Sequence, residues 1–435
     1  MWQTIRNSFA SPAVRKKMIY TIILLIIFRF GSYVFVPFIK QGAMATLMKN
    51  SGASSLFAIM DVFSGGAFAN ATIFAMSITP YVNASIIMML LTNAITPLEK
   101  LSKEGEAGQK KIAQYTRILT VGLAFLQATA FYFMLAKGQN TNGTPLIDTG
   151  WVQYIVIALS FTAGTAFLMW LGEQITEKGI GNGITLIICA GIVAGLPKTF
   201  TALFNAFSAS GGNGTAFVYT LLVLAGILAA VVAVVFMNDS ERRMQIQYAK
   251  RVVGRKMYGG QSNNLPIKLL ASGVMPIIYA MSILSFPQVI CSFFGITNST
   301  PGFWGTFLKL FSSGSWIYAI IYFVLVILFT FFATFMQYQP TQMANQIKQN
   351  GGYLPGIMPG RPTANFIKRV VSRVTVAGAI FMAFLAVLPI LVSIIFHIQI
   401  GLGGTSILIV VGSALDISRQ LESNLITHNY KGFLG

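Results

Sequence analysis

Ten long apolar segments constrain the fold of this chain more than any other feature. They lie at residues 18–38, 72–95, 114–136, 151–171, 183–207, 216–237, 270–294, 316–338, 371–396 and 402–418. A helix needs about 20 mostly apolar residues to cross a bilayer, whereas transmembrane β-strands give alternating segments of about ten residues. Hydrophobic residues make up 55% of the 435 residues and charged residues only 9%, against roughly 25% in soluble proteins. The sequence therefore predicts an all-α integral membrane protein with ten transmembrane helices.

The basic residues between these segments predict how the chain is oriented. Of the 30 Lys and Arg residues, 22 fall in the two termini and the loops on their side, and five fall on the other side. Because Lys and Arg favour the cytoplasmic side, we expect both termini in the cytoplasm. The basic stretch 1–17 precedes a long apolar run, which indicates no cleaved signal peptide. The net charge of +19 suggests contacts with anionic lipid, nucleic acid or acidic protein.

Ten spans divide into two sets of five, and an odd number per half inverts the second half relative to the first. We expect an N-terminal half at 1–207 and a C-terminal half at 208–435. Inverted repeats are common in membrane conduits, where the functional site lies between the halves. A weak internal repeat fits this plan, because Pro80–Ala84 aligns with Pro276–Ala280 at the same place in each half. The two prolines predict kinked helices that face a common cavity.

Residues 57–70 are mostly apolar but are interrupted by Asp61 and by Gly65-Gly66, and Pro80 lies in the apolar stretch that follows. Broken backbone at membrane depth is tolerated only where it is buried in protein or lines a water-filled cavity. One interpretation is a half-inserted segment at 57–70 followed by a kinked helix at 71–95, both beside a cavity. An outside loop with an interfacial helix, followed by an ordinary kinked helix, explains the spacing equally well.

The sequence contains few residues or motifs that could carry catalysis, ion coupling or metal binding. No segment carries an Asp or Glu near its middle, which argues against a proton- or sodium-coupled transporter. His397 and His428 form no metal pattern, no Ser/His/Asp or Cys/His set is evident, and Cys189 and Cys291 imply no disulfide framework. The glycines of Lys178–Thr185 are not a phosphate loop, because no Lys-Ser/Thr follows them; they predict a tight turn. We expect no enzyme activity, metal or cofactor.

Four stretches resemble motifs of the SecY family of protein-translocation channels, in the family's order along the chain. They are FSGGAFANATIFAMSITPYVNASII (63–87), GEQITEKGIGNGITLIICAGIVAGLP (172–197), IQYAKRVVGRKMYGGQSNNLPIK (246–268) and GGYLPGIMPGRPT (351–363). The resemblance implies an hourglass channel in the bacterial plasma membrane that passes unfolded polypeptides and releases hydrophobic segments sideways into lipid. The implied partners are the small subunits SecE and SecG, the SecA motor ATPase, the ribosome, signal peptides, nascent chains and membrane lipids.

The resemblance also assigns a pore ring and a plug. The ring positions fall on Ile78, Val82, Ile188, Ile192, Ile278 and Ile409, and the plug spans about 57–70, with Asp61, Gly65 and Gly66. Ring residues four apart share a helix face. Aliphatic side chains do not hold a polar chain by hydrogen bonds, and an apolar constriction can gate by dewetting. Without the resemblance, the same six residues are equally typical of ordinary lipid-facing or core positions.

A lateral gate and a docking surface are implied in the same way. The gate, between helices two and three and helices seven and eight, would include Asn83, Gln127 and Phe286, and weak interhelical hydrogen bonds would latch it. The ribosome and motor would dock on two large loops, 238–269 and 339–370, through Arg251, Arg255, Lys256 and Arg361. Basic loops by themselves indicate only the cytoplasmic side.

Three positions depart from the family's pattern. Val82 shortens a usual isoleucine of the ring by one methylene. Met358 stands where an arginine is usual, so either the nearby Arg361 substitutes for it or motor coupling differs. Leu270 replaces an asparagine of helix seven, which predicts a less latched gate.

Two other functions stay open. One is a small-solute transporter built on an inverted repeat, whose site would need intramembrane polar residues that are scarce here. The other is a membrane scaffold for partner subunits.

Overall fold

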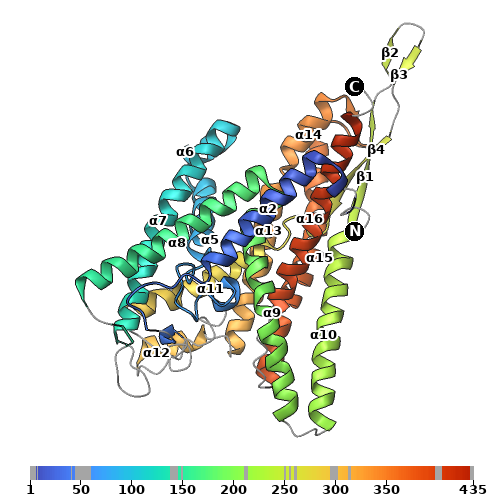
Figure 1. Cartoon of the computed structure of the whole chain (residues 1–435). Helices are drawn as coiled ribbons and strands as arrows, with labels where there is room; N and C mark the ends of the chain where they lie inside the picture. Colours follow the sequence, from blue (N-terminus) through green and yellow to red (C-terminus); the bar gives the residue numbers. More distant parts are fainter. Residues whose placement is uncertain are drawn as a thin grey trace.

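A computed structural model shows how these segments fold (Figure 1). It describes residues 6, 8–40, 42–44, 60–137, 146–147, 150–209, 214–248, 251–253, 256–258, 262–293, 302–311, 315–396 and 404–431. A helix lies over each of the ten apolar segments. These helices are α2 (Pro12–Gly31), α5 (Thr79–Ala94), α7 (Glu106–Lys137), α8 (Trp151–Lys178), α9 (Gly183–Ala209), α10 (Gly214–Asp239), α11 (Met275–Phe293), α13 (Trp316–Gln337), α15 (Arg361–Phe396) and α16 (Gly404–Lys431).

The helices have the character of membrane spans. In the described part of the chain, four are individually long and apolar enough to cross a bilayer, and α5 with the short α6 (Thr96–Lys103), bent by 104° from it, makes a fifth. Helix α13 shows the pattern: Tyr318, Tyr322 and Val326 are buried, while Ile320 and Val324 on another face are 63% and 55% exposed. A helix that is apolar all round fits a lipid-facing position. The predicted helical membrane fold is confirmed.

Several helices extend beyond the apolar segments that predicted them. Helix α7 begins at Glu106 instead of residue 114, and α15 begins at Arg361 instead of residue 371. Hydropathy detects only the part of a helix that lies in hydrocarbon. The polar turns at these ends continue the helix outside it, where an exposed i,i+4 pair such as Glu106 and Lys110 supports them.

The prediction of one kinked helix at 71–95 is wrong. Residues 71–78 form turns, with positive φ at Ala71 and Ser77 (both 51°), and α5 begins only at Thr79. Pro80 therefore lies in the first turn of the helix, where its missing N–H costs nothing and its fixed φ suits the helix. The aligned Pro276 is likewise the second residue of α11. The prolines start these two helices and do not kink them.

Helix α11 lies between two sets of packed helices. Helices α5, α7 and α8 pack in sequence on one side, and α13 packs on α15 on the other (Figure 1). Helix α11 contacts α5 and α7 from the first group and α13 from the second. Helices α9 and α10 both contact α16 and extend together at the end opposite the strands. The largest buried hydrophobic cluster includes residues of all these groups.

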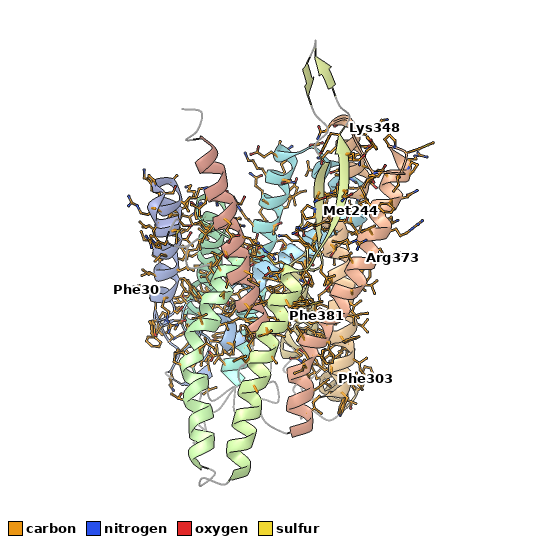
Figure 2. All side chains as sticks on the ribbon, turned by 90° about the vertical axis from the view of Figure 1, so that its right-hand side faces the viewer. Phe30, Met244, Phe303, Lys348, Arg373 and Phe381 are labelled. Atoms are coloured by element: carbon orange, nitrogen blue, oxygen red, sulfur yellow. The ribbon has the colours of Figure 1, made fainter. Side chains whose placement is uncertain are left out.

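The two large basic loops fold into one unit, which adds strands to the predicted all-α fold. Strand β1 (Glu241–Tyr248) pairs antiparallel with β4 (Ser262–Lys268) and with β5 (Gly352–Tyr353) of the second loop. Beyond them, β2 (Arg251–Val253) and β3 (Lys256–Tyr258) form a projecting hairpin (Figure 1). In Figure 2, Met244 of β1 and Lys348 of α14 (Pro340–Gln349) lie at this end, and Phe303 of α12 (Phe303–Leu310) lies at the other.

Candidate functional site

Six aliphatic side chains from α9, α11, α16 and the start of α5 lie in one buried cluster. Ile78 directly precedes α5, Val82 lies in α5, Ile188 and Ile192 lie in α9, Ile278 lies in α11 and Ile409 lies in α16. We call these six the aliphatic collar. None is more than 6% exposed, and all belong to one buried cluster. The structure therefore brings together residues more than 300 positions apart, and none of them points to the outside of the bundle. Their role as a pore ring stays a proposal.

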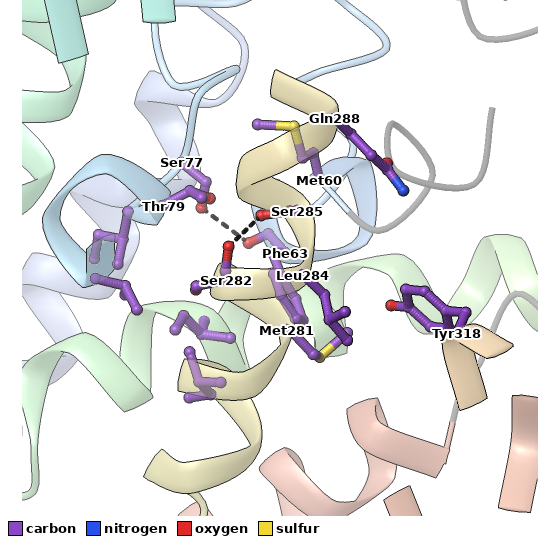
Figure 3. Close-up of a pocket in the computed structure, with 14 residues that line it drawn as sticks. Met60, Phe63, Ser77, Thr79, Met281, Ser282, Leu284, Ser285, Gln288 and Tyr318 are labelled. Atoms are coloured by element: carbon purple, nitrogen blue, oxygen red, sulfur yellow. Dashed lines mark hydrogen bonds between the residues drawn. The ribbon is translucent and has the colours of Figure 1, made fainter. Parts of the chain in front are cut away.

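A cavity borders this collar. Its lining includes Ile78, Val82, Ile188 and Ile278 together with residues before α5, along α11 and at the start of α13. Figure 3 shows Ser282, Ser285 and Gln288 along α11, with Tyr318 to one side. Gln288 donates through Nε2 to the Phe311 carbonyl, and its Oε1 is buried without a partner in the described part of the chain. The cavity wall is apolar at the collar and carries hydroxyl and amide groups along α11.

Residues 61–70 form a short helical turn at 61–64 followed by tight turns at 65–70, and Phe63 lines one side of the cavity. Asp61 accepts two backbone hydrogen bonds, at Oδ1 from Ala69 (2.8 Å) and at its carbonyl from Gly66 (2.9 Å). Gly65 and Gly66 have φ of 67° and 88°, values that glycine adopts without steric cost. Asp61 and the glycines thus define one local structure, which we call the 61–70 turn. Residues 57–59 of the predicted plug lie outside the described residues.

The seam between α11 and the pair α5 and α7 contains two of the three predicted gate residues in buried positions. Asn83 is 6% and Gln127 4% exposed, whereas Phe286 is 37% exposed. Gln127 Oε1 is buried and has no hydrogen-bond partner among the described residues. The sequence reasoning missed Tyr279 of α11, whose hydroxyl faces Ser85 of α5 across the seam. The aligned Pro276–Ala280 repeat contains Tyr279 and could have drawn attention to it.

The predicted docking residues lie on the unit formed by the two basic loops. Arg251 belongs to β2 and Lys256 to β3, Arg255 lies outside the described residues, and Arg361 is the exposed first residue of α15. Met358 is 78% exposed. A separate hydrophobic cluster holds the two loops together; it includes Met244, Ile246, Ile267, Ala344, Ile347, Leu354, Ile367 and Val371. Strand β5 and this cluster make the two loops one body.

The glycine-rich stretch at 178–185 forms the expected tight turn and also joins four helices. The N–H of Ile180 donates to Thr21 Oγ1 of α2 (3.1 Å), and the N–H of Gly181 donates to Gln420 Oε1 of α16 (2.6 Å). Gly181 has a φ of 87°. A Cβ at Gly183 would lie 1.9 Å from the Gly172 carbonyl oxygen of α8. The glycines are therefore needed where the first and last long helices meet α8 and α9.

Comparison with known proteins covers nearly the whole chain. The family model SecY matches residues 72–418. The protein translocase subunit SecY of Thermotoga maritima is 40% identical over 439 residues, covering 100% of this chain and 98% of the relative. That of Bacillus subtilis is 41% identical over 448 residues, covering 100% of both. A solved structure described as a protein conducting channel superposes with a TM-score of 0.62 at 18% identity, covering 94% of this chain and 92% of the other.

These matches and the geometry agree. The fold is that of a protein-conducting channel: a multi-pass helical membrane protein with a buried collar between helices from both ends of the chain. The chain belongs to the SecY family.

Proposed function

We propose that this chain is the pore subunit of a translocase that passes unfolded polypeptides through the aliphatic collar. The observation that carries the proposal is the convergence of six buried aliphatic side chains from α5, α9, α11 and α16 on one cluster. Such a collar seals by excluding water when closed and offers a passing chain no hydrogen bonds. The two halves, 1–207 and 208–435, would be the inverted units, with both termini in the cytoplasm of a bacterium and the collar between them.

Crosslinking a stalled secretory chain tests the pore. A single cysteine replaces Ile188 or Ile278 in a C189S/C291S background, and Ile320, which is 63% exposed on α13, serves as the lipid-facing control. We expect the stalled chain to crosslink through positions 188 and 278 and not through position 320. Labelling at position 320 alone would contradict a passage through the collar.

Sideways release would use the seam between α11 and the pair α5 and α7. A leucine-rich segment of ten residues gains roughly 5 kcal/mol on entering lipid, which is about enough to move a two-state gate from mostly shut to mostly open. The buried Asn83 and the facing hydroxyls of Tyr279 and Ser85 support a weak polar latch on this seam. Leu270, in the turn before α11, lies near Gly378 of α15, and the less latched gate that it predicts stays a prediction.

Docking would use the unit formed by the two basic loops. Two structural neighbours are described as Sec61 in a canine ribosome-channel complex, with a TM-score of 0.58, and as a yeast Ssh1 complex bound to the 80S ribosome, with a TM-score of 0.59. By analogy, the β2–β3 hairpin would meet the ribosome, and Arg361 beside the exposed Met358 would contribute to the SecA contact. SecE and SecG would cover part of the apolar outer surface.

A further inference from the structure

Arg29 is a charged residue inside the first apolar segment, and nothing in the proposed translocation path accounts for it. A guanidinium at membrane depth is costly, and such residues mark functional contacts. Of the other basic residues within or at the ends of spans, Arg117 of α7 forms a two-pronged ion pair with Glu173 of α8 (2.8 Å), and Arg373 lies on the exposed surface of α15 (Figure 2). Arg29 instead turns towards the 61–70 turn.

The guanidinium of Arg29 bridges α2 and that turn. Its Nη1 donates to the carbonyl oxygen of Gly65 (3.1 Å), and its Nη2 donates to the hydroxyl of Tyr33 (2.7 Å). The guanidinium carbon also lies 4.8 Å from the centroid of the Tyr33 ring, within cation–π range. Tyr33 lies one helical turn further along, so Arg29 keeps a partner even when the turn is absent. The contact with Gly65 can therefore break without leaving the charge alone.

Helix α9 supports the turn at Gly191. A Cβ at Gly191 would lie 2.3 Å from the Phe63 carbonyl oxygen, and a Cβ at Gly65 would lie 3.1 Å from the Gly191 backbone. The two backbones thus touch where neither residue has a side chain. Gly191 lies between Ile188 and Ile192 of the aliphatic collar, and Phe63 lines the same cavity as Ile188. A turn seated on Gly191 therefore borders the collar.

We propose that Arg29 is a positioning residue that latches the 61–70 turn onto the collar, and that Gly191 is the seat on which the turn rests. This inference depends on the proposed role of the turn as the plug of a closed channel. Arg29 bonds the backbone carbonyl of Gly65, so the latch does not depend on the side chains of the turn. A hydrogen bond from a charged donor changes such an equilibrium by about ten-fold or more. Breaking either interaction should therefore free the turn without changing the collar.

The test follows displacement of the turn in the complete translocase complex, reconstituted in vesicles without a substrate. Ala67, which is buried in the turn, becomes a single cysteine (A67C) in the C189S/C291S background, and a membrane-impermeant maleimide reports its exposure. We expect R29Q and G191A to label about ten-fold faster than the parent and to raise the resting ion leak, while R29K, which keeps a charged donor, falls between. Parent rates in both R29Q and G191A would overturn the latch.

Matched controls separate the latch from general damage. G195A adds a methyl group one turn further along α9, where no described residue lies within 4 Å of the added Cβ. Y33F removes only the second hydrogen bond of Arg29. Both variants should label like the parent. All variants should still translocate a preprotein with a strong signal sequence. Deleting residues 61–70 should produce an ion leak. If the deletion variant shows no ion leak, the proposed plug role fails. If the deletion variant leaks ions but R29Q and G191A label and leak like the parent, only the latch is overturned.

Discussion

The hydroxyls of Tyr279 and Ser85 face each other across the seam between α11 and α5. We expect a hydrogen bond between them to contribute to how hydrophobic a signal must be to open the gate. Interhelical hydrogen bonds in membranes average about 0.6 kcal/mol, close to the gain from one additional leucine entering lipid. We expect Y279F to lower the insertion threshold by about one leucine, measured with a Leu/Ala series of test segments in a reconstituted translocase.

A matched control for this prediction lies on α13. The Tyr322 hydroxyl is buried with no hydrogen-bond partner among the described residues, so Y322F removes a hydroxyl without breaking a bond and should leave the threshold unchanged. Equal thresholds for Y279F and the parent would contradict the latch. The same assay tests Leu270. If the parent inserts less hydrophobic segments than L270N does, its gate is less latched, as predicted. If the parent needs more hydrophobic segments than L270N, the prediction is refuted.

At the scale of elements, the glycine-rich turn between α8 and α9 has a strict steric requirement. Because a Cβ at Gly183 would lie 1.9 Å from the Gly172 carbonyl oxygen, the G183A variant must push α8 and α9 apart. Overpacking of this kind costs about 1–3 kcal/mol. We expect a lower melting temperature of the purified complex, measured by tryptophan fluorescence or scanning calorimetry.

The control is G122A in α7, where an added Cβ meets no described residue within 4 Å. Alanine favours the helix over glycine by about 0.5–1 kcal/mol, so G122A should melt at the same temperature as the parent or slightly higher. Equal melting temperatures for G183A and the parent would mean that the helices separate there without cost.

At the scale of the whole molecule, the β2–β3 hairpin projects from one end of the bundle, away from α5 and α9 (Figure 1). Reversing charge at Arg251 and Lys256 should therefore weaken ribosome binding and leave the pore intact. Removing one basic side chain that binds a phosphate lowers the slope of log affinity against log salt by about one. We expect R251E/K256E to bind ribosomes more weakly and with less salt dependence, measured by co-sedimentation from 50 to 200 mM salt.

A charge reversal on the other predicted face, K40E, controls for net charge and should bind ribosomes like the parent. The crosslinks at positions 188 and 278 should persist in R251E/K256E when the stalled chain is supplied in excess. Unchanged ribosome affinity in this variant would place docking elsewhere.

The sequence by itself determined the membrane class and the ten helical segments, because hydropathy and charge act locally and can be read from neighbouring residues. The four motifs, in particular those at 172–197 and 246–268, also identified the family from sequence. The start of α5 was misplaced, since apolar residues occur in the turns at 71–78 as readily as in the helix.

Only the tertiary structure decided which apolar residues are buried and what they contact. Ile278 and Ile320 are equally hydrophobic, yet one lies in the collar at 3% exposure and the other is 63% exposed. The fusion of two basic loops through β5, and the seating of Gly65 between Arg29 and Gly191, join residues distant in the chain. Such contacts depend on how helices pack in three dimensions, and local hydropathy carries no information about the partner that a given face meets.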